Sequence, residues 1–181
     1  MYSPFYKLPF IVQIIAGLLI IDFLEYWLHR LLHTSNLLWQ IHKLHHSIKD
    51  MDWIGNMRFH PFEIIYYKHL KYLPLLFLGF SAEIYLWTGV FSLGIGYLNH
   101  ANLKWNYGLL RYLLNSPRMH IFHHDKINHF KYGQNFAVVF SLWDFIFKTA
   151  FMPDGQPEEL GFKGDKNFPT KVHMQFLSPL L

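Results

Sequence analysis

The chain has no cysteine and few charged residues. Charged residues make up 15% of the 181 positions, against about 25% in ordinary soluble domains. The missing cysteine excludes disulfides, cysteine-ligated zinc and iron–sulfur clusters. The net charge of +4 is small and the basic residues are scattered, so no nucleic-acid-binding surface is expected. Apolar residues reach 52% and aromatic residues 19%, which predicts a membrane protein or one domain with a very large core.

The first apolar run covers residues 9–28 and is interrupted only by Gln13, Asp22 and Glu25. Twenty helical residues rise about 30 Å, the thickness of a bilayer core, so we predict a first membrane span here. The run is not a signal peptide, because it is too long, has no small-residue cleavage site and leads directly into a histidine-rich segment.

A second apolar region, residues 61–100, is too long for one span. Gly79 can end a helix and Ser81 can cap the next one, which predicts a hairpin of two spans at about 62–80 and 82–99. Lys68, His69 and Lys71 would extend to the membrane interface. A soluble all-α domain is the alternative, because these runs also contain acids and many aromatic residues.

Three spans of this kind place every clustered histidine on one side of the membrane. Only Lys7 lies on the other side, and an excess of Lys and Arg marks the cytoplasmic face. We therefore predict an all-α integral membrane helical bundle, in the bacterial inner membrane or endoplasmic reticulum. It is a single domain over residues 1–181, with a cytoplasmic-side His-rich helical cap (29–60 and 100–151) and a tail (152–181).

Within the cap and tail, three segments carry local signals. Ser116 and Pro117 predict a helix start, with Ser as N-cap and Pro in the first turn. Residues 136–151 are aromatic but too short for a span, which favours an interfacial helix or core packing. Residues 153–170 are rich in Pro, Gly and charge and predict an exposed loop.

Thirteen histidines are the outlier of the composition. Eight of them form three clusters whose spacings of three and four residues share one helix face, so each cluster can aim two or three imidazoles at one point. Neutral imidazole binds Fe, Zn, Cu and Ni. The alternative is that these histidines are hydrogen-bonded core residues and bind no metal. The clusters are His29 and His33; His42, His45 and His46; and His120, His123 and His124.

Eight histidines exceed the capacity of one ion, so two ions with four or five ligands each fit better. His100 is the natural ninth ligand, because it ends the returning arm of the hairpin. His60 is a further candidate, as a ligand or as a capping group. His69, His129 and His173 have no partner at ligand spacing. A zinc peptidase is disfavoured because HExxH is absent, and a bis-histidine haem would leave most of the set unexplained.

The first predicted span carries a polar stripe, which continues into the first cluster at steps of three or four residues. It consists of Asp22, Glu25, Tyr26, His29 and His33. Acids within a span usually face a partner or a cavity. We expect these carboxylates to accept the outer N–H of ligating histidines and so to fix their tautomers. Alternatively, they only mark the end of the span.

The chain resembles the sterol desaturase / fatty acid hydroxylase superfamily of membrane-bound di-iron enzymes over nearly its whole length. The order and spacing of the HxxxH, HxxHH and HxxHH boxes make the resemblance specific. The matching blocks are DFLEYWLHRLLH (22–33), LWQIHKLHHS (38–47), MDWIGNMRFHP (51–61), NHAN (99–102), SPRMHIFHH (116–124) and NFAVVFSLWDFIFKT (135–149).

This resemblance implies an oxidoreductase that uses two Fe ions and O2 to hydroxylate or desaturate a lipid C–H bond, in a sterol, fatty acyl chain or related lipid. Electrons would come from a separate electron-transfer protein or reductase, because no dinucleotide or haem motif occurs. Members often carry further spans before this first helix, so Met1 is expected to begin a trimmed or minimal version. The implied iron ligands are His29, His33, His42, His45, His46, His100, His120, His123 and His124.

Two positions depart from the family pattern, because Ala137 and Lys148 stand where glycine is usual. Either residue would be strained if the backbone there takes a positive φ. Two other functions stay open. One is a non-enzymatic metal-binding or metal-transport membrane protein, and the other is a lipid-binding relative with inactive metals.

Overall fold

The computed structural model describes residues 4–180, so the ends of the predicted domain, 1–3 and 181, lie outside it. The described chain is helical and contains no β-strand, only isolated bridges such as Asp125–Leu160. The long helices are α1 (Phe10–Thr34) and α5 (Ala82–His100). The short α-helices are α2 (Asn36–His42), α3 (Pro61–Glu63), α4 (Leu73–Phe77), α6 (Pro117–His123), α7 (Leu142–Ile146) and α8 (Val172–Leu177).

Single turns join these helices. One is the π-helical η4 (Ile64–Lys68), and the others are 3₁₀ turns. The 3₁₀ turns are η1 (Pro4–Lys7), η2 (His45–Ser47), η3 (Trp53–Met57), η5 (Gly108–Tyr112), η6 (Asp165–Asn167) and η7 (Ser178–Leu180).

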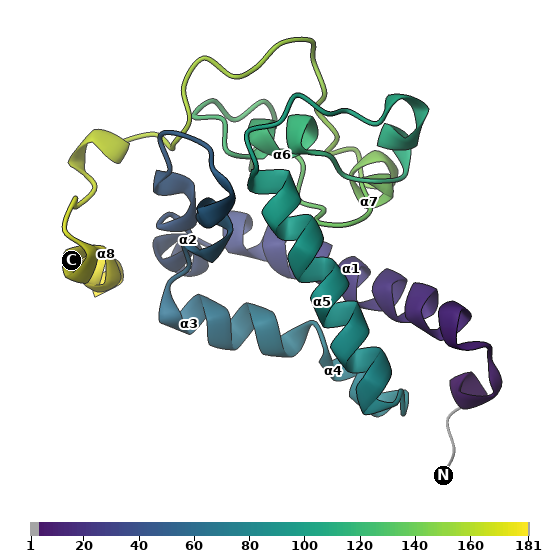
Figure 1. The fold of residues 1–181 in the computed structure, drawn as a ribbon. Helices are drawn as coiled ribbons and strands as arrows, with labels where there is room; N and C mark the ends of the chain where they lie inside the picture. Colours follow the sequence, from purple (N-terminus) through teal and green to yellow (C-terminus); the bar gives the residue numbers. More distant parts are fainter. Residues whose placement is uncertain (1–3, 181) are drawn as a thin grey trace.

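Helices α1 and α5 pack against each other, and most of the shorter elements pack on one or the other of them (Figure 1). They approach closely at Gly17, where an added Cβ would lie 2.9 Å from the Thr88 methyl carbon. The core beside this contact is aliphatic and consists of Ile14, Leu18, Ile21, Leu75 and Ile84. Helix α6 lies at the C-terminal end of α5 and α7 lies beside the middle of α1, whereas α8 lies apart beside α2.

A helix is present where the first span is predicted, and it is longer than expected. The sequence predicts 9–28, whereas α1 continues to Thr34 and so carries His29 and His33 on its last turns. Ser35 ends α1, and its hydroxyl accepts the Leu38 N–H that opens α2. Within residues 4–180, α1 alone is both long enough and apolar enough to cross a membrane. The number of spans and the cytoplasmic side of the cap stay predictions.

The arm predicted at 62–80 is not one continuous helix. The segment consists of α3, η4 and α4, with a turn at residues 71–72. Pro74 explains the break, because it has no N–H to donate to the preceding turn, although it suits the first turn of α4. The turn between the arms is as predicted, since Gly79 has a φ of 71° and the Ser81 hydroxyl accepts the Ile84 N–H.

Large apolar side chains are exposed at the end of the hairpin. Leu76, Phe77 and Leu86 expose 68%, 81% and 61% of their surfaces. A contiguous apolar surface of this kind marks contact with lipid or with another protein.

The cap and tail agree with their local signals. The Ser116 hydroxyl accepts the Met119 N–H at 3.2 Å and Pro117 lies in the first turn of α6. Segment 136–151 forms only the short α7 and packs on α1, where Tyr26 contacts the rings of Phe136 and Phe147. The loop 153–170 is largely exposed and is fastened by Asp165, which pairs with Lys49 and Lys126.

Of the two departures from glycine, one is strained. Lys148 has a φ of 58°, whereas Ala137 does not adopt a positive φ. We predict that Lys148→Gly raises the free energy of unfolding by about 1 kcal/mol, because the exposed lysine loses little packing and glycine accepts this conformation. Thermal unfolding in detergent measures the change. Lys148→Ala is the control and should give no gain, since alanine keeps the strain. Equal stability of the glycine and alanine variants would contradict the prediction.

Candidate metal centre

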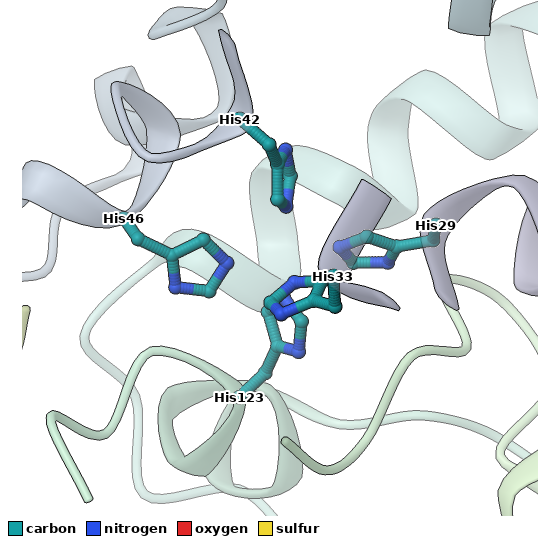
Figure 2. Close-up of side chains that lie close together, drawn as sticks. All are labelled: His29, His33, His42, His46 and His123. Carbon is teal, nitrogen blue, oxygen red and sulfur yellow. The ribbon is translucent and has the colours of Figure 1, made fainter. Parts of the chain in front are cut away.

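All nine histidines singled out by the sequence lie together, in two adjacent groups. Within each group the facing nitrogen atoms lie within 4.8 Å of one another. All nine side chains are buried except His33, which is half-buried. The five-histidine group is His29, His33, His42, His46 and His123, and the four-histidine group is His45, His100, His120 and His124. Figure 2 shows the rings of the five-histidine group converging from α1, from the segment around α2 and from α6.

Each HxxHH box is divided between the two groups. The outer pair of the first box, His42 and His46, joins the five-histidine group, while His45 joins the other. The second box does the reverse, with only His123 in the five-histidine group. In helical geometry, positions i and i+4 differ by about 40°, whereas consecutive positions differ by about 100°. One box can therefore supply two neighbouring centres.

Rings of the two groups are in direct contact along a common boundary. The centroids of His46 and His124 lie 4.6 Å apart, and those of His42 and His45 lie 5.3 Å apart, with one member of each pair in each group. The same holds for His120 and His123, at 5.2 Å. The arrangement therefore suits two neighbouring ions rather than two independent sites.

Fixed acceptors orient several of the rings. The Nδ1 atoms of His29, His123 and His100 donate to the carbonyl oxygens of Phe136, Gln134 and Gly96, at 2.7, 2.8 and 2.8 Å. A carbonyl oxygen can only accept, so each Nδ1 carries the proton. The Nε2 atom of each neutral ring then carries a lone pair and no hydrogen, which is the form that binds a metal.

A carboxylate orients one ring of the five-histidine group. His42 Nδ1 lies 2.6 Å from Glu63 Oε1, and both side chains are buried. A carboxylate that accepts the outer N–H of a ligating imidazole fixes its tautomer and raises its basicity. Sequence reasoning missed Glu63, because it lies 21 positions from His42 and no local spacing connects the two.

Seven of the nine histidines keep a buried ring nitrogen with no hydrogen-bond partner. The atoms are His33, His42, His46 and His123 Nε2, His45 and His120 Nδ1, and both nitrogens of His124. Buried polar atoms are normally paired, because leaving one unpaired costs about 1–3 kcal/mol. A shared cation would satisfy those nitrogens that face the centre of a group, so the donor set fits metal ions.

The second group shows nitrogen atoms facing each other. His100 Nε2 lies 3.3 Å from His45 Nε2 and 3.2 Å from His120 Nε2. Because His100 carries its proton on Nδ1, its Nε2 has no hydrogen to give. Burial lowers the pKa of His45 and of His120 well below the ordinary value, and the neighbouring imidazoles lower it further. Both rings are therefore neutral at pH 7, as metal ligands must be.

The acids of the first helix have a different role from the one expected. Asp22 accepts the N–H groups of Val139 and Phe140, each at 2.8 Å, so the expectation that it orients a histidine is wrong. Glu25 accepts from Lys71 Nζ at 2.8 Å and from the Ser92 hydroxyl at 3.3 Å. These acids bind the hairpin and the segment 136–151, the closing segment of the cap, to α1.

The four remaining histidines lie outside both groups. His60 caps α3, since its Nδ1 accepts the Phe62 N–H and its Nε2 donates to the Phe176 carbonyl at 2.8 Å. With both ring nitrogens engaged, it is a capping group rather than a ligand. His129 pairs with Asp125, while His69 and His173 are exposed. None of these three has ligand geometry, as the spacing predicts.

A small cavity of about 30 Å³ adjoins rings of both groups. His29 and His42 of one group and His45, His100 and His120 of the other line it. Its remaining wall is mixed. Phe59, Tyr67, Leu93 and Val138 supply apolar surface, and Glu25, Asn56, Ser92 and Asn99 supply polar groups. The cavity can therefore hold a reacting group directly beside the imidazoles.

Comparisons with known proteins show which family the chain belongs to. Residues 14–149 match the family model described as fatty acid hydroxylase. The ornithine lipid hydroxylase OlsE of Rhizobium tropici is 34% identical over 148 residues, which cover 80% of this chain and 44% of that protein. The alkylglycerol monooxygenase of Homo sapiens is 33% identical over 156 residues, which cover 86% and 34%.

A more distant relative is the very-long-chain aldehyde decarbonylase GL1-7 of Oryza sativa subsp. japonica, 26% identical over 176 residues, which cover 88% of this chain and 26% of that protein. The chain thus spans less than half the length of these relatives. No solved structure matches. The family model covers most of the chain and all nine grouped histidines. Eight of these histidines belong to the three boxes, and His100 lies between the second box and the third. The chain belongs to the fatty acid hydroxylase family, within the sterol desaturase / fatty acid hydroxylase superfamily.

Proposed function

We propose that the two histidine groups hold two iron ions and that the protein uses O2 to hydroxylate or desaturate a C–H bond of a lipid. The observation that carries this proposal is the pair of buried, adjacent histidine groups with unpaired ring nitrogens. The names of the relatives, a lipid hydroxylase and a monooxygenase, support oxidation of a lipid by O2. All nine grouped histidines are the proposed ligands.

The reaction requires an external electron donor. In hydroxylation, one oxygen atom of O2 enters the C–H bond and the other leaves as water, which consumes two electrons and two protons. Desaturation removes two hydrogens from the lipid and forms two waters, with the same demand for electrons and protons. Bound iron would supply the activation of O2. We propose a separate electron-transfer protein or reductase as the source of electrons.

The residues of the chain supply position and protection from water. The carbonyls of Phe136, Gln134 and Gly96 and the carboxylate of Glu63 hold four rings at fixed angles. The cavity beside the rings is too small for bulk water. Such a small, rigid site would place a lipid carbon close to the oxidising centre and limit side reactions.

The position of the groups favours an enzyme over a transporter. His29 and His33 lie on the last turns of α1 and His100 ends α5, so the ligands gather where the long helices finish. A transporter would place its polar ligands near the middle of the spans. We propose that this end faces the cytoplasm, as the basic residues indicate. Oxygen uptake that depends on both lipid and reductant separates an enzyme from a transporter and from a relative with inactive metals.

We predict that His45→Ala abolishes lipid oxidation and lowers bound iron, because a buried member of the four-histidine group is lost. The chain should still be found in the membrane fraction. Metal analysis of purified protein and product analysis by mass spectrometry measure both effects. His173→Ala is the matched control, since this histidine is exposed and lies outside both groups. Unchanged iron in the His45 variant would count against the assignment.

We predict that Glu63→Gln weakens iron binding about tenfold to a hundredfold, because the amide orients His42 without adding basicity to its ring. Iron retained after dialysis against a graded chelator gives the affinity. Glu83→Gln removes an exposed carboxylate on α5 and should leave it unchanged. If both variants retain iron equally, Glu63 does not support the site.

A further inference from the structure

Two residues that line the cavity beside the histidines each carry a buried polar atom with no hydrogen-bond partner. Asn56 Nδ2 and Asn99 Oδ1 are both buried and unpaired, and both residues line the cavity. The two side chains expose only 7% and 1% of their surfaces. One atom is a donor and the other an acceptor, and neither belongs to the histidine groups.

The orientation of Asn99 is fixed by its other end. Its Nδ2 donates to the Val138 carbonyl at 2.8 Å. A flip of the amide would bring two oxygen atoms together, so Oδ1 must be the atom that stays unpaired. Asn99 also precedes His100, the ring that faces both His45 and His120. Its free acceptor is thus held next to the four-histidine group.

Asn56 occupies a space that α5 leaves open for it. Asn56 lies on η3, and a Cβ added to Gly96 would lie 2.8 Å from its Oδ1 and 3.1 Å from its Nδ2. Any other residue at position 96 would therefore displace the amide. Gly96 also supplies the carbonyl that orients His100, so one turn of α5 positions both the Asn56 amide and the His100 ring.

We infer that the lipid substrate carries a hydrogen-bonding group, with both a donor and an acceptor, next to the carbon that is oxidised. A hydroxyl or a secondary amide has this chemistry. Asn56 donates to the acceptor of this group and Asn99 accepts from its donor. The two asparagines are positioning residues, and the inference rests on the proposed function, because it concerns the substrate of that site.

The size and lining of the cavity support this assignment over a plain hydrocarbon. About 30 Å³ holds one small group rather than a length of acyl chain. An alkyl segment would leave both amides unpaired, which typically costs about tenfold to a hundredfold in affinity for each. A site built to hydrogen-bond a substrate discriminates strongly against an analogue that lacks the group.

The test compares lipids with and without the donor. The probes are 2-hexadecyloxyethanol against its methyl ether, and N-hexadecanoylglycine methyl ester against its N-methyl analogue. Binding to purified metal-loaded protein is measured without oxygen or reductant, so no turnover interferes. We expect the donor-bearing member of at least one pair to bind ten times more tightly or better. The pair that discriminates identifies the hydroxyl or the amide as the source.

Variants test whether Asn99 causes the difference in affinity between lipids with and without the donor. Asn99→Leu should bring the ratio of the two affinities close to one, with bound iron unchanged, whereas a merely structural role would weaken both probes alike. Asn102→Leu is the control, because this exposed asparagine lies three positions further along. If the Asn99 variant fails to fold, Asn56→Leu should weaken both members of the pair relative to hexadecane.

Two outcomes overturn the inference. One is equal binding, or no binding, of both members in both pairs by the wild-type protein, as expected if water alone fills the polar wall. The other is a preference for the donor-bearing member that survives in Asn99→Leu or, if that variant does not fold, an Asn56→Leu variant that binds both members as tightly, relative to hexadecane, as the wild-type protein does. The failure of the proposed function would be seen separately, as a protein that binds no iron. Iron content therefore distinguishes the two failures.

Discussion

The structure depends on keeping nine imidazole rings, eight of them buried, close together and turned toward one another. Buried nitrogens without partners are unfavourable, and the cost is repeated on seven of these rings. A chain would not maintain this arrangement for packing, because apolar residues would fill the same space without the penalty. The rings instead form a preorganised donor set, and the helices, turns and closing segment hold it in place.

The acids of the molecule mainly hold the backbone that in turn holds the rings. Asp144 accepts the N–H groups of Phe136 and Ala137, at 2.8 and 3.0 Å, and Asp22 does the same for the next turn of that segment. Burial raises the pKa of Asp144 to about 6, although the hydrogen bonds from the Thr149 hydroxyl and from the two backbone N–H groups act to lower it. Because Phe136 is clamped in this way, its carbonyl can orient His29. These acids therefore act on the rings indirectly, through the backbone that orients them, and not by direct contact with a histidine as the polar stripe suggests.

Local signals in the sequence predict much of this structure. The caps at Ser81 and Ser116 depend on neighbouring residues alone and are present. The spacing of the boxes predicts two centres with four or five ligands, and the rings form groups of five and four. By contrast, the pairing of His42 with Glu63 and the carbonyls that orient the other rings are contacts between distant segments. A single sequence does not reveal such contacts, and an apolar composition at 62–80 hides the break that Pro74 causes.

The cavity lies where the apolar and polar parts of the molecule meet, and this position gives a substrate a direction. Asn99 and His100 lie at the end of α5. Leu93, two turns earlier, also lines the cavity and exposes 46% of its surface. Val90 and Leu86 follow one and two turns earlier on the same face and are exposed 51% and 61%. A lipid whose polar group contacts the asparagines would therefore lay its chain along this face of α5, toward the exposed end of the hairpin. The oxidised carbon would lie near the polar end of the lipid, because the rings stand beside the asparagines and away from the apolar end.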